Sequence, residues 1–350
     1  MKMSLASVTA KINQTFTRLA AEGPLDMPQK SLRAALLPEE YCAVKPGSCR
    51  SDAKLDERCW QDDGCGASTQ LSMRERRSLS RRYDLYGDGD LSRSSSQLGA
   101  DGKWPDLYFI GDSILAQMVD YGVKCELSRA KQSIHVEYTE LLKGEFGQLW
   151  KVLLAIRAKQ RGIVVVSFGL HFDNEGSTNA RTPKGTRAEF NTAVENVFTV
   201  LDNLRQSCPR CGALFLTATS QHFATADGAY AAPPKATENI APSYSCRALQ
   251  ADALASETSP QRWREEDVLR IAARYPRVAV APLTTLSRSW WDMHIGATSR
   301  SWRGVAYSNA SRVRVDCTHF CYSLFLLEPV WWALRLVVRA TAESTLPVEL

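Results

Sequence analysis

The fold of this chain is decided by one stretch, Leu107-Tyr108-Phe109-Ile110-Gly111-Asp112-Ser113. Its aliphatic and aromatic run predicts a buried strand that ends at Gly111, and residues 114–121 predict a helix directly after it. Ser113 therefore stands at the carboxyl end of a strand and at the amino end of a helix. This layout displays a serine as a nucleophile, although Gly-Asp-Ser triplets are common and a serine in this place also caps helices.

Downstream of Trp104 the chain alternates between predicted strands and predicted helices. Continuous apolar runs predict the strands, and apolar residues at helical spacing predict the helices. The further strands are predicted at 133–138, 162–168, 213–217 and 278–281, and the helices at 149–156, 188–204 and 265–273. This order predicts an α/β fold with a mostly parallel sheet covered on both sides. Functional loops in such sheets lie beyond the carboxyl ends of the strands.

A base for Ser113 is predicted near the other end of the chain, in Asp316-Cys317-Thr318-His319. A serine hydroxyl needs a neighbouring base, usually a histidine that a carboxylate orients. His319 is the predicted base, and Asp316 is predicted to accept its ring N–H and fix its tautomer. We expect both residues in one short loop. The alternative is a chance Asp-x-x-His pattern in a disulfide-rich loop.

Three further candidates follow predicted strands at the same edge of the sheet. Gly169 offers a backbone N–H as the second oxyanion donor, beside the N–H of Ser113. His171 and His222 are candidates for contact with the acyl group or its acceptor. Each histidine serves equally well to satisfy loop carbonyls, so both interpretations stay open at this point.

Composition divides the 350 residues into three segments. Residues 1–66 predict an accessory segment held by cysteines, residues 67–103 a polar linker rich in Ser, Arg and Gly, and residues 104–345 the catalytic domain. The net charge of +5 is modest, and no aromatic residues interleave with the arginines of Arg74-Glu75-Arg76-Arg77 and Arg81-Arg82, which argues against a nucleic-acid partner. Gly87-Asp88-Gly89-Asp90 lacks the closing glutamate of a calcium loop, so we predict no metal and no cofactor.

The ten cysteines favour disulfides and an oxidising compartment, and we expect a secretory location, in the Golgi lumen or outside the cell. Cys208 and Cys211 favour a disulfide over a zinc site, because a second matching pair is missing. Residues 1–29 contain no signal-peptide core, so we expect that a signal or anchor is missing from this chain, and that anchor is the one membrane contact we expect. The alternative is that the protein is not secretory. The apolar run 324–338 predicts a buried terminal helix.

Four blocks of the sequence resemble the PC-esterase group, the trichome-birefringence-like and Cas1p-like members of the GDSL/SGNH hydrolase superfamily. The blocks are Phe-Ile-Gly-Asp-Ser (109–113), Phe-Gly-Leu-His-Phe (168–172), Gln-His-Phe (221–223) and Asp-Cys-Thr-His-Phe-Cys (316–321). The resemblance extends from residue 104 to about residue 336 and implies a flavodoxin-like three-layer α/β/α sandwich. It also implies O-acyl chemistry, usually acetyl, on sugar hydroxyls, with Ser113 as nucleophile, His319 as base and Asp316 as orienting acid.

One departure from that pattern is Ser167, where related sequences often have an asparagine. Losing one oxyanion donor typically costs about 2.7–4 kcal/mol. We expect an esterase or O-acyltransferase whose partners are a carbohydrate acceptor and an acyl donor. The alternatives are a catalytically inactive glycan-binding or interaction module on the same fold and, third, a zinc-dependent protein.

Overall fold

The computed structural model describes residues 4–22, 105–119, 134–138, 147–175, 184–225, 227–230, 246–288, 294–298, 314–320 and 324–343. Its centre is a five-stranded parallel sheet with the order β2-β1-β3-β6-β7. The strands are β1 (Leu107–Gly111), β2 (Ile134–Tyr138), β3 (Gly162–Ser167), β6 (Cys211–Leu216) and β7 (Ala279–Ala281). The predicted α/β class is confirmed, and each predicted strand is present with ends shifted by at most two residues.

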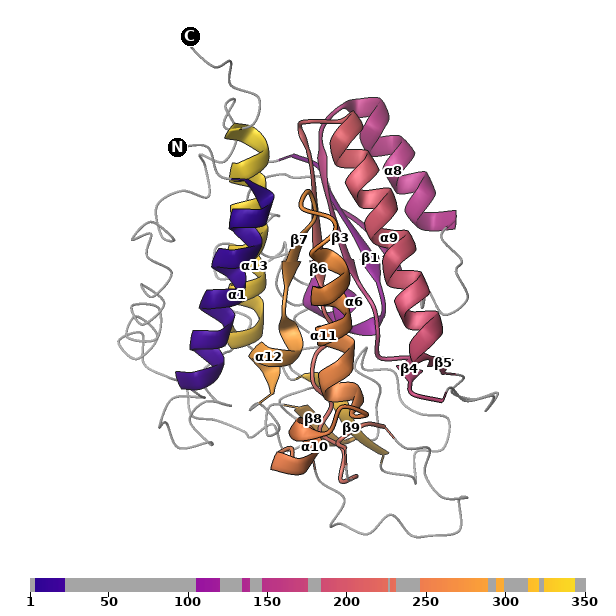
Figure 1. Cartoon of the computed structure of the whole chain (residues 1–350), viewed down its shortest axis with the longest axis vertical. Helices are drawn as coiled ribbons and strands as arrows, with labels where there is room; N and C mark the ends of the chain where they lie inside the picture. The colour runs from indigo at the N-terminus through magenta and orange to yellow at the C-terminus, as the bar shows by residue number, and fades with distance from the viewer. Residues whose placement is uncertain are drawn as a thin grey trace.

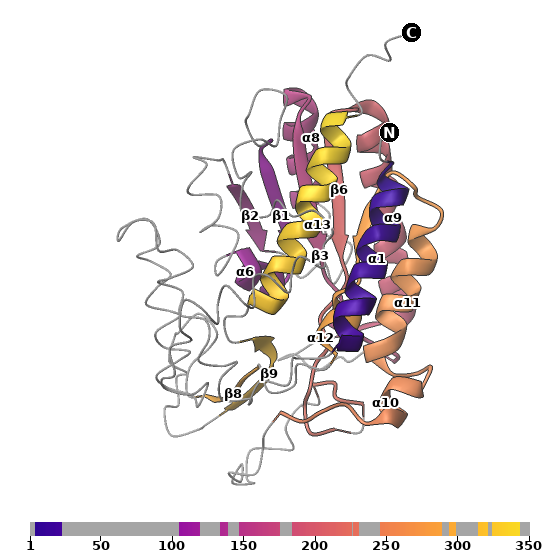
Figure 2. The same ribbon diagram turned by 90° about the vertical axis from the view of Figure 1, so that its left-hand side faces the viewer.

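Helices cover both faces of this sheet and give the molecule three layers (Figures 1 and 2). One face packs against α1 (Leu5–Glu22), α6 (Ser113–Met118), α12 (Leu283–Ser287) and α13 (Leu324–Glu343). The other face packs against α8 (Gly147–Lys159), α9 (Arg187–Ser207) and α11 (Pro260–Ala272). Because strand side chains alternate in direction, Phe109 enters the first core and Ile110 the second.

The first helix belongs to this α/β body. Buried apolar side chains lie along one stripe of α1 and join the core that α12 and α13 share: Leu5, Val8, Ile12 and Phe16. Thr9 Oγ1 also accepts the N–H of Val280 at 3.2 Å, at the outer edge of β7. The structure differs here from the expected boundary at residue 104, because the apolar stripe of α1 is buried against the sheet. The clustered cysteines of segment 1–66, the linker 67–103 and its Gly-Asp repeat lie outside the described residues.

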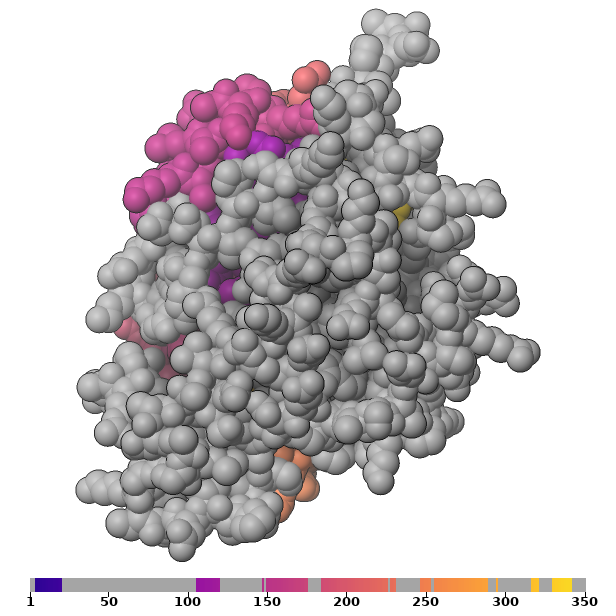
Figure 3. Space-filling view, turned by 180° about the vertical axis from the view of Figure 1, so that it is seen from behind, coloured from indigo at the N-terminus to yellow at the C-terminus, as the bar shows by residue number. Residues whose placement is uncertain are grey.

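Two helices illustrate opposite environments. α13 is the buried terminal helix that its apolar run predicts, with Ala333 and Val337 completely enclosed. α8 lies at the surface, in magenta at the upper left of Figure 3, and exposes Trp150 and Leu154 one turn apart. Among the helices of the described ranges, none combines the length and hydropathy needed to cross a membrane.

Smaller elements lie beyond the carboxyl ends of the parallel strands (Figure 1). They are β4 (Phe172–Asp173) paired with β5 (Gly185–Thr186), β8 (His294–Thr298) paired with β9 (Arg314–Phe320), and the short helix α10 (Ala251–Ala255). The expectation that Asp316 and His319 lie in a loop is wrong, because both belong to β9. The antiparallel pairing with β8 joins segments that carry no strand signal strong enough to have been predicted.

The order of the sheet reverses at the neighbouring strands β1 and β3. In doubly wound sheets, ligands bind outside the carboxyl ends of the strands at this point. Gly111 and Ser167 end the two strands in register with one another. A Cβ on Gly111 would lie 2.2 Å from the Ser167 carbonyl oxygen, so the close approach of the two strand ends requires glycine.

Candidate functional site

Ser113 begins α6 directly beyond the end of β1. The helix is capped by Asp112, whose carboxylate Oδ1 accepts the N–H of Ile114 at 3.0 Å. The N–H of Asp112 in turn donates to the Ser167 carbonyl at 3.2 Å. Ser113 is half-buried, and no hydrogen bond between described residues involves its hydroxyl. The capping role thus belongs to Asp112 and not to Ser113.

A bulge in β9 creates the predicted Asp316–His319 pair. Gly296 pairs with Asp316 and His294 with Phe320, so β9 carries two more residues than β8 across this interval. Such insertions bend a strand and redirect its side chains. Asp316 Oδ1 accepts the N–H of His319 at 2.9 Å, and Asp316 Oδ2 accepts the ring Nδ1–H of His319 at 2.8 Å. Because a carboxylate accepts only, the proton of His319 on this side is fixed on Nδ1.

The carboxyl of Asp316 is held in its ionised form. Burial by itself would raise its pKa, but the positive charge of His319 and the hydrogen bond from its ring outweigh burial. The backbone N–H groups of His319 and Thr318 add to this effect, and the pKa of Asp316 lies below its ordinary value. An ionised carboxylate in this position stabilises a positive charge on the neighbouring imidazole.

α6 and β9 are joined by the side chain of Gln117. Its Nε2 donates to the Phe320 carbonyl at 2.7 Å, and its Oε1 accepts the Phe320 N–H at 3.1 Å. Ser113 lies four residues before Gln117 and therefore on the same face of α6. His319 lies one residue before Phe320. This double hydrogen bond thus connects the face of α6 that carries Ser113 with the part of β9 that carries His319.

Buried Asp112 interacts electrostatically with two of the candidate histidines. Asp112 is only 1% exposed, and burial raises its pKa. Positive charge on His171, the N–H groups at the start of α6 and positive charge on His319 all oppose that rise. Side-chain charges interact appreciably only over short distances, and most strongly in a buried setting. Asp112 therefore lies within electrostatic range of both His171 and His319.

The loop that follows β3 is held in a special conformation. Gly169 has a φ of +146°, and a Cβ there would lie 3.2 Å from the ring of Phe190. Arg264 of α11 is buried beneath this loop and donates to the carbonyls of Leu170 and Phe172, which fixes the loop in place. Burial lowers the pKa of Arg264 to about 10, so it is still a cation at neutral pH. The loop carries Gly169, together with half-buried His171, to the switch point of the sheet.

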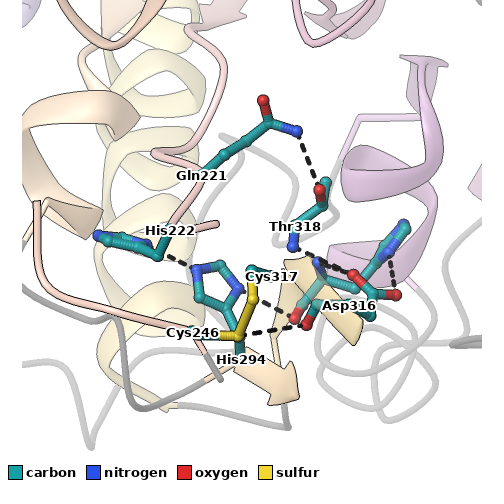
Figure 4. Close-up of a disulfide and its surroundings, with 8 residues drawn as sticks. Gln221, His222, Cys246, His294, Asp316, Cys317 and Thr318 are labelled. Atoms are coloured by element: carbon teal, nitrogen blue, oxygen red, sulfur yellow. Dashed lines mark hydrogen bonds and ion pairs between the residues drawn. A yellow bond between two sulfur atoms is a disulfide. The ribbon is translucent and has the colours of Figure 1, made fainter. Parts of the chain in front are cut away.

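His222 is enclosed by the protein and not exposed at the surface of the site. It is completely buried, its Nε2 lies 2.8 Å from the Arg288 carbonyl, and its Nδ1 lies 2.7 Å from Nε2 of His294 (Figure 4). Both ring nitrogens are thus engaged by the protein. Of the two interpretations that the sequence leaves open for His222, the structure favours support of neighbouring segments over contact with the acyl group or the acceptor.

Two disulfides lie among the described residues. Cys208 is bonded to Cys211, and Cys246 is bonded to Cys317 on β9, beside Asp316 (Figure 4). The predicted pairing of Cys208 with Cys211 is confirmed, and their sulfurs are not zinc ligands in this state. In the part of the chain that the structure describes, no three His, Cys, Asp or Glu side chains form a group suited to a metal.

Sequence reasoning missed several residues that build the site: Asp112 as the helix cap, Gln117, Arg264 and His294. Asp112 had a usable signal, because an aspartate directly before a predicted helix is a typical cap. The other three act through contacts with distant segments, for which a single sequence has no comparable signal.

Comparison with protein-family models and with curated proteins finds no match to this chain. The assignment of a function therefore depends on the geometry of the site and on the chemistry of its residues.

Replacing Gln117 with Met is expected to lower the free energy of unfolding by about 2 kcal/mol or more, because it removes two hydrogen bonds to the buried main chain of Phe320. Gln206, an exposed glutamine on α9, provides the matched control, and Gln206→Met should change stability by less than about 0.5 kcal/mol. Chemical denaturation measures both values. Equal effects of the two substitutions would contradict the role assigned to Gln117.

Proposed function

We propose that this protein is a serine-nucleophile esterase or O-acyltransferase that acts on carbohydrate hydroxyls, built on an SGNH-type sandwich. The observation that carries the proposal is the 2.8 Å hydrogen bond between Asp316 and His319, on a strand that Gln117 ties to the helix beginning at Ser113. The order β2-β1-β3-β6-β7, second-first-third-fourth-fifth along the chain, is also the flavodoxin-like order and supports the finer fold assignment.

In the first half-reaction, Ser113 Oγ attacks the acyl carbonyl carbon and its proton passes to Nε2 of His319. Asp316 stabilises the resulting imidazolium through Nδ1. The N–H groups of Ser113 and Gly169 are the proposed donors to the tetrahedral oxyanion. The intermediate then expels the alcohol, which takes the proton from His319, and leaves an acyl ester on Ser113.

In the second half-reaction, water or a sugar hydroxyl gives its proton to His319 and attacks the acyl-serine. Collapse of this second tetrahedral intermediate releases the acid or the new ester and returns the proton to Ser113. An esterase and a transferase differ only in which hydroxyl arrives at this step, so exclusion of water determines the outcome.

The carbohydrate and acetyl parts of the proposal come from the resemblance of the four sequence blocks to the PC-esterase group. The oxidising compartment is supported by the disulfides Cys208–Cys211 and Cys246–Cys317, since such bonds persist mainly in secreted and luminal proteins. A secretory location, reached with a signal or anchor, belongs to the same proposal.

A fluorophosphonate probe tests the function without knowledge of the substrate, because it reacts with serines that a base has activated. We expect the folded protein to be labelled, the adduct to map to Ser113 by mass spectrometry, and Ser113→Ala to remain unlabelled. A folded protein that resists the probe would contradict the proposal. It would favour the non-catalytic module, whose binding to glycans should survive Ser113→Ala.

A further inference from the structure

The buried rings of His222 and His294 lie next to one another (Figure 4) and belong to a hydrogen-bonded chain that reaches the main chain of the proposed base. His222 Nε2 lies 2.8 Å from the Arg288 carbonyl, and His222 Nδ1 lies 2.7 Å from His294 Nε2. His294 Nδ1 then lies 3.1 Å from the carbonyl of His319. The His294 ring also stacks on Phe320, with ring centroids 4.1 Å apart. The chain thus links the end of α12 to the main chain of the proposed base.

Counting protons shows that this chain is not satisfied by two neutral rings. The two terminal contacts are to carbonyl oxygens, which only accept, so His222 Nε2 and His294 Nδ1 must both carry protons. The central contact between two ring nitrogens needs a third proton. Two neutral imidazoles supply only two. A neutral pair therefore leaves one contact without its proton, and a pair with one positive charge completes all three.

The surroundings of the pair oppose that charge. Burial lowers the pKa of His222 to about 4, partly offset by its bond to the Arg288 carbonyl. Burial, with the charge of His222 next, also lowers the pKa of His294 well below its ordinary value. Among the described residues, the His319 carbonyl and Asp316 favour a charge on His294, and the His319 ring opposes it. The pair is therefore neutral at pH 7, with one of its three contacts incomplete.

We infer that His222 and His294 are positioning residues for His319, which take up one proton jointly and thereby complete the hydrogen-bonded chain that ends on the His319 main chain. When the pair is neutral, its two protons satisfy either both terminal contacts or one terminal contact and the contact between the rings. One added proton satisfies all three contacts together. The labelling experiments rest on the proposed function, because they need a reactive Ser113. The number of protons that the two rings share does not depend on catalysis.

Two substitutions of His294 test the roles of its two ring nitrogens one at a time. Asparagine places its amide near the position of Nδ1 and keeps a donor for the His319 carbonyl, whereas glutamine places its amide near Nε2 and keeps the link to His222. Loss of one net hydrogen bond corresponds to about a two- to tenfold change. We therefore expect His294→Gln to slow fluorophosphonate labelling by about two- to tenfold relative to His294→Asn, in the rate of bond formation and not in probe affinity.

The joint proton uptake is measured on the full chain with ¹⁵N-labelled histidine, by recording ring nitrogen shifts from pH 7.5 to pH 4. Five histidines make the assignment tractable with single variants. We expect the rings of His222 and His294 to respond together, at one shared midpoint below the ordinary value of 6.5. In His222→Gln, the titration midpoint of the His294 ring should differ from the midpoint that the two rings share in the wild type.

The free energy of unfolding depends on pH through the same proton uptake. Since an unfolded histidine binds its proton near pH 6.5 and buried His222 only near pH 4, the unfolded chain binds more protons between these values. The contribution of the pair to stability is thus full above about pH 6.5 and is lost as the pH falls. His222→Gln should flatten this part of the stability profile.

Each result decides the inference. The inference is wrong if His222 and His294 titrate at separate midpoints and substitution of one ring leaves the midpoint of the other unchanged. It is also wrong if His294→Gln and His294→Asn slow labelling equally, because that result indicates a merely structural role. If the wild type is not labelled at all, the proposed function fails, while the ring titrations still decide whether the pair shares a proton.

Discussion

Asp316→Asn is expected to slow acylation of Ser113 by about 10⁴-fold while leaving the protein folded. The asparagine carbonyl oxygen can still accept the backbone N–H groups of Thr318 and His319, as Oδ1 of Asp316 does. Its NH₂ group then faces His319 Nδ1, which must become an acceptor. The remaining ring proton moves to Nε2, the nitrogen that has to accept the proton of Ser113. The substitution thus selects the wrong tautomer with little change in shape.

The rate constant for reaction with a fluorophosphonate measures this effect. Asp106→Asn serves as the control, since Asp106 precedes β1 at the opposite end of the sheet and pairs with Lys159 at 2.6 Å. Its labelling rate should stay within about twofold of the wild type, as expected of a surface ion pair. A labelling rate in Asp316→Asn equal to that of the control would remove Asp316 from the triad.

Removing the disulfide between Cys246 and Cys317 is expected to lower the free energy of unfolding by about 4 kcal/mol. Its two cysteines are separated by 71 positions, so the bond restricts a long segment of the unfolded chain. It also anchors β9 beside Asp316, which makes the same variant a test of the site. We expect Cys246→Ala/Cys317→Ala to lose labelling at temperatures where the wild type retains it.

The matched control is the second disulfide, because Cys208 and Cys211 are equally buried but separated by only 3 positions. Its removal by Cys208→Ala/Cys211→Ala should cost about 2 kcal/mol by the same loop-closure argument. Denaturant unfolding of both double variants gives the comparison. A larger loss from the short loop than from the long one would show that packing, and not chain restriction, dominates.

Much of the fold could be predicted because its signals are local. The run before Gly111, the apolar segment 162–168 and the amphipathic stripe of α9 each specify their element from neighbouring residues. The antiparallel pair of β8 and β9 could not be predicted in the same way, since its hydrogen bonds join two separate segments and its bulge interrupts the alternation.

The sequence by itself determined the α/β class, the display of Ser113 between a strand and a helix, and the three-residue spacing that lets Asp316 reach His319. These features depend on residues adjacent in the chain, so composition and spacing are enough. Only the tertiary structure decided that Gln117 holds Phe320 across 203 positions, and that His222 meets His294 behind the proposed base. Contacts of this kind form when the packed layers bring distant segments together, and no local pattern encodes the partner of a single buried polar side chain.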